Sequence, residues 1–231
     1  MQKVLFRIKT VALGIVITSM VTAMTGCDPD DNTTTPITVT DIDGNVYTTA
    51  TIGSQTWTVE NLRTTRYKDG TAIQTELDNS AWEDDTTGAY AIYDDDNDNN
   101  TVYGKQYNWH AVNTGKLAPE GWHVPTRAEW ETLVAHLGGS TVAGGKMKSN
   151  SSLWNSPNAG ATEGSLFKGL PGGYKTNSGI FALIGSAGYW WASTERNATQ
   201  GNYLNLVDNL AGANINGANK EFGYSIRLIK D

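Results

Sequence analysis

Oxygen-bearing side chains are most concentrated in one short segment of this chain, the run Asp94-Asp-Asp-Asn-Asp-Asn-Asn100. Asp94, Asp96 and Asp98 alternate as ligands do in a calcium-binding loop, and Ca²⁺ prefers carboxylate and amide oxygens. The EF-hand pattern is incomplete, because Asn99 stands at the position of the obligatory glycine and Lys105 at that of the final glutamate. The run therefore predicts either a calcium site, the one cofactor that the sequence suggests, or a solvated acidic loop.

Residue types that carry catalysis in other proteins are few and scattered. The three histidines, His110, His123 and His136, show neither His-x-His nor the i, i+4 spacing of a helical metal site. No serine lies in a Gly-x-Ser-x-Gly turn, which presents the nucleophile in α/β-hydrolases. We therefore expect a protein that is not an enzyme, in which His123 has a structural role.

Aromatic side chains are abundant, with 8 Trp and 10 Tyr, and a flat ring suits the C–H face of a sugar. Trp190 and Trp191 are adjacent on a predicted strand, so they point to opposite faces and at most one is expected to face outward. Tryptophans beside turns are expected to pack in the core: Trp57, Trp109, Trp122 and Trp130. The remaining candidates for ligand contact lie in less patterned regions: Trp82, Trp154 and Tyr203.

The N-terminal 26 residues have the order of an export signal, with basic residues, an apolar run over 11–17 and small residues before Cys27. The apolar run is shorter than the about 20 residues that a membrane span needs. Met24-Thr-Gly-Cys27 resembles the lipobox of bacterial lipoproteins. This resemblance implies that 1–26 are a signal peptide and that Cys27 carries the lipid anchor. A plain secretory signal with a chance cysteine is the alternative.

Residues 27–36 are acidic, polar and bounded by prolines, which predicts a flexible tether. An acidic stretch directly after a lipidated cysteine is similar to the surface-export signals of Bacteroidetes lipoproteins. It implies an outer-membrane protein that is lipid-anchored and exposed at the cell surface.

The chain has 17 basic and 24 acidic residues, a net charge of −7. This charge repels phosphate, so a nucleic acid partner is not expected.

From residue 37 the pattern changes to short β-rich runs separated by turns. Runs over 37–40, 46–52 and 55–59 flank Asp43-Gly44 and Gly53-Ser54, which predicts a three-stranded meander. Residues 60–101 are loop-dominated, with isolated aromatics that we expect to pin the loops to the core. Further strands are expected over 189–194, 202–207 and 222–229.

Helix signals are strongest after Pro125. Thr126 and Glu129 have the spacing of a capping box, and a stripe of apolar residues at i, i+3, i+4 and i+7 predicts a helix over about 127–138. A short helix is expected within 105–112, and a short helical or turn segment is expected over 142–149. Many short strands and one well-capped helix predict an α+β fold for the domain 37–231, with small antiparallel sheets and long irregular loops.

A set of segments, in this order, resembles the Fibrobacter succinogenes major paralogous domain over 37–231: Thr40-Asp-Ile-Asp-Gly-Asn-Val-Tyr47, Ile52-Gly-Ser-Gln-Thr-Trp57, Glu60-Asn-Leu62, Tyr103-Gly104, Tyr107-Asn-Trp109, Gly121-Trp-His-Val-Pro-Thr126, Glu129-Trp130, Leu170-Pro-Gly-Gly-Tyr174, Tyr189-Trp-Trp-Ala-Ser-Thr194 and Gly223-Tyr-Ser-Ile-Arg227. The family occurs mainly in secreted and lipid-anchored proteins of Bacteroidetes and Fibrobacteres. Its biochemical role is largely undefined.

A more distant resemblance bears on the fold. Val124-Pro-Thr-Arg-Ala-Glu-Trp130 and Gly223-Tyr-Ser-Ile-Arg-Leu228 are similar to patterns of the formylglycine-generating enzyme superfamily, whose fold is related to C-type lectins. The resemblance implies a C-type-lectin-like domain. It does not imply the enzyme's activity, because that chemistry needs cysteine and residues 28–231 contain none.

These patterns predict a lipid-anchored, cell-surface binding or adhesion module that recognises a glycan or a protein without catalysis. A structural or accessory subunit of a surface assembly, such as a pilus tip, is the alternative, and an unrecognised enzyme is a weaker one. An exposed aromatic site with a polar rim would favour glycan binding, whereas a larger apolar patch would favour docking in an assembly.

Overall fold

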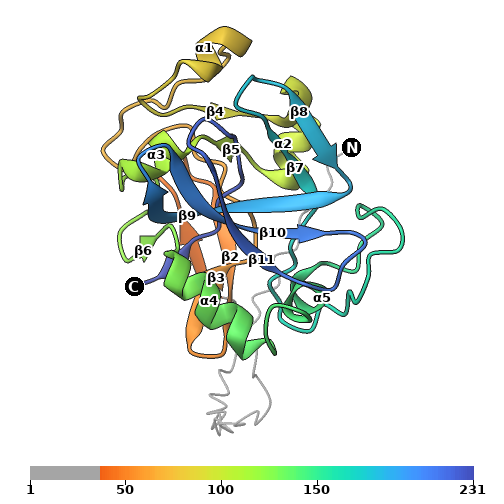
Figure 1. Ribbon diagram of the computed structural model, residues 1–231. Coiled ribbons are helices and arrows are strands. Elements are labelled where there is room, and N and C mark those ends of the chain that lie inside the picture. Colours follow the sequence, from red (N-terminus) through yellow and green to blue (C-terminus); the bar gives the residue numbers. More distant parts are fainter. Residues whose placement is uncertain (1–36) are drawn as a thin grey trace, which may run out of the picture. The chain divides into compact units, whose positions relative to one another are not determined.

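The computed structural model describes residues 37–231 (Figure 1). The predictions of a signal peptide over 1–26, a tether over 27–36 and lipidation at Cys27 therefore lie outside the described residues. The elements in chain order are β1 (Thr38–Thr40), β2 (Val46–Ile52), β3 (Gln55–Thr58), α1 (Asn79–Glu83), β4 (Tyr90–Ala91), η1 (Tyr93–Asp95), α2 (Asn97–Tyr103), β5 (Gln106–Tyr107), α3 (Trp109–Asn113), β6 (Trp122–His123), α4 (Arg127–His136), α5 (Ala143–Met147), β7 (Gly172–Lys175), β8 (Phe181–Ile184), β9 (Ala187–Asn197), β10 (Gln200–Val207), β11 (Asn214–Asn219) and β12 (Ile229–Lys230).

One five-stranded sheet joins the two ends of the described chain, in the order β1-β2-β3-β12-β6. β1, β2 and β3 pair antiparallel, which confirms the predicted meander. The C-terminal strand β12 lies between β3 and β6, where Ile229 pairs with Trp57 on one side and His123 on the other. This pairing fixes the C-terminal segment against the first strands of the domain.

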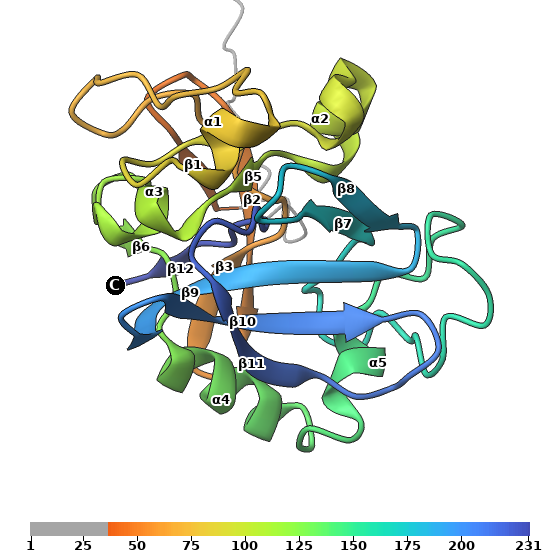
Figure 2. The same cartoon turned by 45° about the horizontal axis from the view of Figure 1, so that its top comes forward.

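The second five-stranded sheet has the order β11-β10-β9-β7-β8 and contains the two longest strands, β9 and β10 (Figure 2). Its pairings are antiparallel except for β7 and β9, which run parallel with Gly173 opposite Gly188. The expected α+β fold is confirmed as a mixed fold dominated by sheet. The expectation of purely antiparallel sheets is wrong at this one pairing.

The largest departures from the predicted elements lie near the C-terminus. β11 was not expected, because its sequence Asn-Ile-Asn-Gly-Ala-Asn is poor in β-formers. The strand expected over 222–229 is an irregular segment that forms single bridges with Tyr107, Lys175 and Trp190. Only its last residue, Ile229, belongs to a strand, β12. The segment 105–112 contains β5 and the start of α3 rather than one helix.

The predicted capped helix is confirmed as α4. The Thr126 hydroxyl accepts a hydrogen bond from the Glu129 amide, and the Glu129 carboxylate accepts from the Thr126 amide, so the capping box is complete. α4 lies against β9, β10 and β11. Its buried residues Trp130, Leu133 and Val134 therefore close one face of the second sheet.

Two apolar clusters fill the faces of the second sheet. Trp190 belongs to the cluster under α4, where Phe167 contacts Trp57, Trp130 and Trp190 edge-on. Trp191 belongs to the cluster on the opposite face. The two side chains do point to opposite faces, but both are fully buried. Neither is therefore available to a ligand.

A buried polar node connects the two sheets. Asn61 Oδ1 accepts hydrogen bonds from Trp190 Nε1 at 2.9 Å and from Arg227 Nε at 2.6 Å. Arg227 is fully buried and also donates to the carbonyls of Thr58 and Phe167. Within residues 37–231 no carboxylate forms an ion pair with it, so backbone and amide oxygens alone satisfy this cation. The segments Glu60-Asn-Leu62 and Gly223-Tyr-Ser-Ile-Arg227 therefore meet inside the domain.

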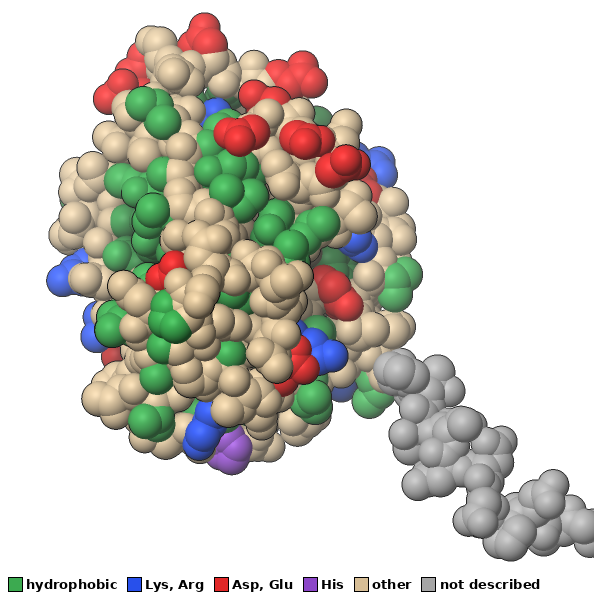
Figure 3. All heavy atoms as spheres, turned by 90° about the vertical axis from the view of Figure 1, so that its right-hand side faces the viewer, with side chains coloured by type: hydrophobic (Ala, Val, Ile, Leu, Met, Phe, Trp, Pro, Cys, Tyr) green, Lys and Arg blue, Asp and Glu red, His purple; other side chains and the backbone are tan. Residues whose placement is uncertain are grey.

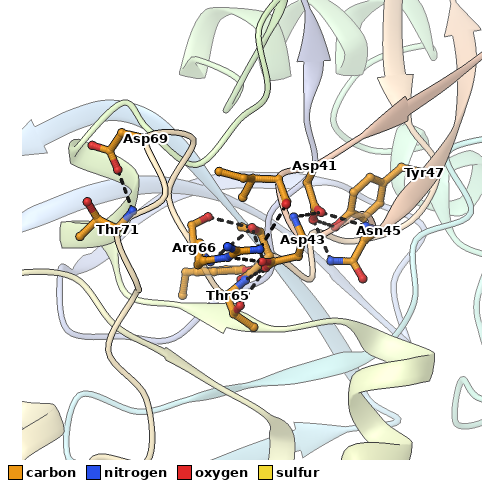
Figure 4. Close-up of polar contacts among 11 residues, drawn as sticks. Asp41, Asp43, Asn45, Tyr47, Thr65, Arg66, Asp69 and Thr71 are labelled. Carbon is orange, nitrogen blue, oxygen red and sulfur yellow. Dashed lines mark hydrogen bonds and ion pairs between the residues drawn. The ribbon is translucent and has the colours of Figure 1, made fainter.

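A second polar cluster fixes the β1–β2 turn to the following loop (Figure 4). The Asp43 carboxylate accepts hydrogen bonds from the Thr65 amide, the Thr65 hydroxyl and Arg66 Nε. Asp41 accepts a hydrogen bond from the Tyr47 hydroxyl at 2.6 Å.

Four aromatic side chains of the loop-rich segment 60–101 are buried: Tyr67, Trp82, Tyr90 and Tyr93. This burial confirms the prediction that they anchor the loops to the core.

Candidate ligand-binding site

An aromatic hollow of about 370 Å³ opens beside β9 and β10. We call it the tyrosine pocket, and its lining residues are Tyr174, Tyr189, Gln200, Tyr203, Gly217, Ala218, Asn219, Phe222 and Tyr224. Tyr224 is buried, whereas the other four rings are half-buried. The pocket thus combines aromatic rings that reach solvent with amide side chains, Gln200 and Asn219, at its border.

Strand register positions these rings. Tyr203 of β10 lies opposite Trp191 of β9, and Asn205 lies opposite Tyr189, so all four side chains project from one face of the sheet. Tyr174 comes from the neighbouring strand β7. The pocket is therefore built by four strands, β7, β9, β10 and β11, and completed by rings from the irregular C-terminal segment.

The rings support one another. Tyr224 lies at the centre, with ring centroids 4.4 Å from Trp191, 5.0 Å from Tyr189 and 5.0 Å from Tyr203. Tyr174 contacts Tyr189 edge-on at 4.9 Å. Such contacts hold aromatic side chains in fixed orientations. A ligand would therefore meet a platform that is already ordered before binding.

The tyrosine pocket carries no formal charge. Burial raises the pKa of Tyr189 to about 12 and also raises the pKa of Tyr203 and of Tyr224, so these phenols stay protonated at neutral pH. Among residues 37–231, none accepts or donates a hydrogen bond with the hydroxyls of Tyr174, Tyr189 or Tyr203. A phenol both donates and accepts. These hydroxyls are available to a polar, uncharged ligand.

The structure places the three aromatic residues that the sequence suggested as ligand contacts in different environments. Trp82 is 1% exposed and donates its indole N–H to the Glu221 carbonyl; Trp154 is 4% exposed and donates to the Gly169 carbonyl. Both are core residues, so the prediction that they contact a ligand is wrong. Tyr203 lines the tyrosine pocket. Tyr174, Tyr189 and Phe222 were missed. The alternation of Tyr189 with Trp191 on one face of β9 is the signal that could have identified Tyr189.

The acidic run lies at the end of the molecule that carries α1 and α2, where acidic side chains gather on the surface (Figure 3). Asp96 caps α2 by accepting a hydrogen bond from the Asp98 amide, and Asp94 and Asp98 are exposed. Over the described part of the chain, no three His, Cys, Asp or Glu side chains are grouped to hold a metal ion. Calcium binding by Asp94, Asp96 and Asp98 stays a prediction.

A larger hollow of about 670 Å³ lies among the loops, and we call it the loop cavity; its border includes Glu76, Asp78, Tyr90, Asp95 and Lys105. Lys105 is 5% exposed, and its ammonium donates to Asn100 Oδ1 at 3.0 Å and lies over the Tyr90 ring. Burial lowers the pKa of Lys105. An enzyme could use a desolvated lysine of this kind, and burial lowers the pKa of Lys148 and of Lys175 in the same way.

His123 was expected to have a structural role, and its contacts join two segments of the domain. Its ring bonds two carboxylates, Asp231 through Nδ1 at 2.6 Å and Glu129 through Nε2 at 2.9 Å. Burial acts to lower the pKa of His123, but the bonds to Asp231 and Glu129 outweigh it and raise the pKa. The ring thus ties the C-terminus to the start of α4.

The fold and the site together define a mixed α and β domain whose hollows include an uncharged aromatic pocket and an acidic loop cavity. The family described as the Fibrobacter succinogenes major domain matches residues 50–230, and the chain belongs to this family. The match begins within β2, whereas the same sheet already begins at β1. No curated protein and no solved structure matches the chain.

Over residues 37–231, no helix has the length and apolar character needed to cross a membrane.

Proposed function

We propose that this protein is a lipid-anchored, cell-surface binding module that recognises a glycan through the tyrosine pocket, without catalysis. The observation that carries the proposal is the set of half-buried rings Tyr174, Tyr189, Tyr203 and Phe222 beside the amides of Gln200 and Asn219. Aromatic rings offer flat apolar faces to sugar C–H groups. Amides and phenols both donate and accept, as sugar hydroxyls require.

The proposed location rests on the sequence. Cys27 follows a basic start and an apolar run in the order of a lipoprotein signal, and the acidic residues after it are similar to surface-export signals. A surface anchor would place the tyrosine pocket where extracellular glycans are present. We also propose that the domain has a C-type-lectin-like fold, because the segments 124–130 and 223–228 are similar to patterns of a superfamily related to that fold.

An alternative function, a structural or accessory subunit of a surface assembly such as a pilus tip, is favoured by one observation. β8 is one of the two edge strands of the second sheet. Ile180 beside it is 59% exposed, and Leu183 within it is 47% exposed. Edge strands with exposed apolar residues pair readily with other chains. The weaker alternative, an unrecognised enzyme, would rest on Lys105 in the loop cavity.

A glycan array probed with residues 27–231 carrying Cys27→Ser tests the proposal. Binding that is lost in Tyr203→Ala is expected, because this change removes a ring face from the pocket. Removal of one stacked ring lowers affinity by about tenfold. The matched control is Leu210→Ala, which truncates an exposed apolar side chain beyond β10. It is expected to bind as the parent does.

Three results would redirect the proposal. Glycan binding that survives Tyr203→Ala would exclude the tyrosine pocket as the site. Protein binding lost in Leu183→Lys and retained in Tyr203→Ala would favour the accessory subunit. Turnover of a bound compound that Lys105→Met abolishes would favour the enzyme.

A further inference from the structure

We infer that the tyrosine pocket takes an uncharged sugar unit and that the neighbouring faces of β10 and β11 bind further units of the same polysaccharide chain. This inference rests on the proposed function and adds the class of glycan and a second set of contacts. It assigns three asparagines, Asn205, Asn214 and Asn216, to the site.

The absence of charge is the first observation. None of the nine residues that line the tyrosine pocket is acidic or basic. An acidic sugar would have to give up its hydration there without a counter-ion, which is costly. The nearby cation Arg196 is exposed and donates to Asn216 Oδ1 at 3.0 Å, and it does not line the pocket. The pocket therefore favours neutral sugars.

The second observation is the register of β10 and β11. Asn214 lies opposite Asn205, and Asn216 lies opposite Tyr203. Because Asn205 also lies opposite Tyr189, these asparagines share the sheet face from which Tyr189 and Tyr203 project. Pairs two residues apart along antiparallel strands are separated by about 7 Å. The amides thus continue the pocket as a row along the same face of the sheet.

The third observation is that these amides are available. Within the described residues, no side-chain hydrogen bond engages Asn205 or Asn214, and Asn214 is exposed. Asn216 uses its oxygen to accept from Arg196 and from the Gly217 amide, which leaves its N–H groups free. An amide can bond two adjacent hydroxyls, donating to one and accepting from the other. Such a row suits the internal units of a polysaccharide.

The test is calorimetry on the full-length chain in detergent, with disaccharides and hexasaccharides of glucose, xylose and mannose and with oligogalacturonate as the acidic probe. At least one neutral hexasaccharide is expected to bind about tenfold or more tightly than the disaccharide of the same sugar. The reason is that the amides of Asn205 and Asn214 make two further contacts, each of which contributes about fivefold to affinity. Asn205→Ala with Asn214→Ala should remove this gain and leave disaccharide affinity unchanged. Asn214→Ala alone, at an exposed position, should remove part of it.

Asn209→Ala, at an exposed turn position beyond β10, is the matched control and should keep the gain. Equal affinity for short and long chains, or tighter binding of oligogalacturonate, would overturn the inference and leave the pocket's proposed function intact. Binding that Tyr203→Ala does not weaken, or no binding of any probe, would contradict the proposed function as well.

Discussion

Replacement of Asn61 by alanine should destabilise the domain more than any surface change, because this one side chain satisfies three buried groups. Asn61 Oδ1 accepts from Arg227 Nε and from Trp190 Nε1, and its amide donates to the Tyr103 carbonyl at 2.7 Å. Asn61 is 5% exposed and Arg227 is 1% exposed. Both side chains are therefore largely shielded from bulk water.

The magnitude follows from what is left unpaired. A neutral buried group without its hydrogen bond costs about 1–3 kcal/mol, and a buried charge that loses a partner costs about 3–5 kcal/mol. Arg227 keeps its hydrogen bonds to the carbonyls of Thr58 and Phe167, so its guanidinium loses only the partner of Nε. We expect Asn61→Ala to lower the free energy of unfolding by about 3–5 kcal/mol.

Urea denaturation followed by tryptophan fluorescence measures this change. With a slope of about 2.5 kcal/mol per molar, the midpoint should fall by about 1–2 M. Asn61→Asp keeps the acceptor oxygens and should cost less than Asn61→Ala. Asn209→Ala, an exposed asparagine, should stay within about 0.5 kcal/mol of the parent. A loss below about 1 kcal/mol for Asn61→Ala would refute the argument that the node needs this amide.

Three further predictions concern pH and the anchor. Burial acts to raise the pKa of Asp43, but hydrogen bonds from Thr65, Arg66 and Thr64 outweigh it and lower the pKa from 3.8 to about 2. Asp43 therefore stabilises the fold above pH 3.8, and this contribution is lost as the pH falls through about 2. Asp43→Asn should cost about 1 kcal/mol at neutral pH after screening around exposed Arg66, and a cost that did not shrink in acid denaturation would contradict this. His123 has a raised pKa, so its contribution is complete below the ordinary value of 6.5 and is lost as the pH rises through the folded value. The melting temperature of His123→Gln should thus lie furthest below that of the parent in mild acid, and an equal gap in alkaline buffer would refute the ion pairs with Asp231 and Glu129. Cys27→Ser should release the protein from the membrane fraction, and a variant that stayed membrane-bound would disprove lipidation.

Local signals in the sequence were sufficient for some elements. The Asp43-Gly44 turn between alternating β-formers fixes the β1–β2 hairpin, and the Thr126–Glu129 capping box fixes the start of α4. Each depends on residues a few positions apart. Such signals act before distant contacts form, which explains why these two predictions are confirmed.

The candidate site depends on contacts that no local pattern encodes. Trp82 was predicted as a ligand contact because it lies in a less patterned region, but the Glu221 carbonyl, 139 residues further on, accepts its indole N–H inside the core. The tyrosine pocket combines rings from β7, β9, β10 and the C-terminal segment. β11 forms despite a weak β-propensity because β10 offers it an unpaired edge. These features follow from the packing of the whole domain.

Hydrogen–deuterium exchange of the full-length chain, with and without a neutral hexasaccharide that binds it, locates the site most directly. If the tyrosine pocket is the glycan site, exchange should slow in Gln200–Val207, in Asn214–Asn219 and around Phe222, and should be unchanged around Glu76 and Asp95. Protection confined to the loop cavity, or absent from all of these segments while the sugar is bound, would contradict recognition of glycans by the tyrosine pocket.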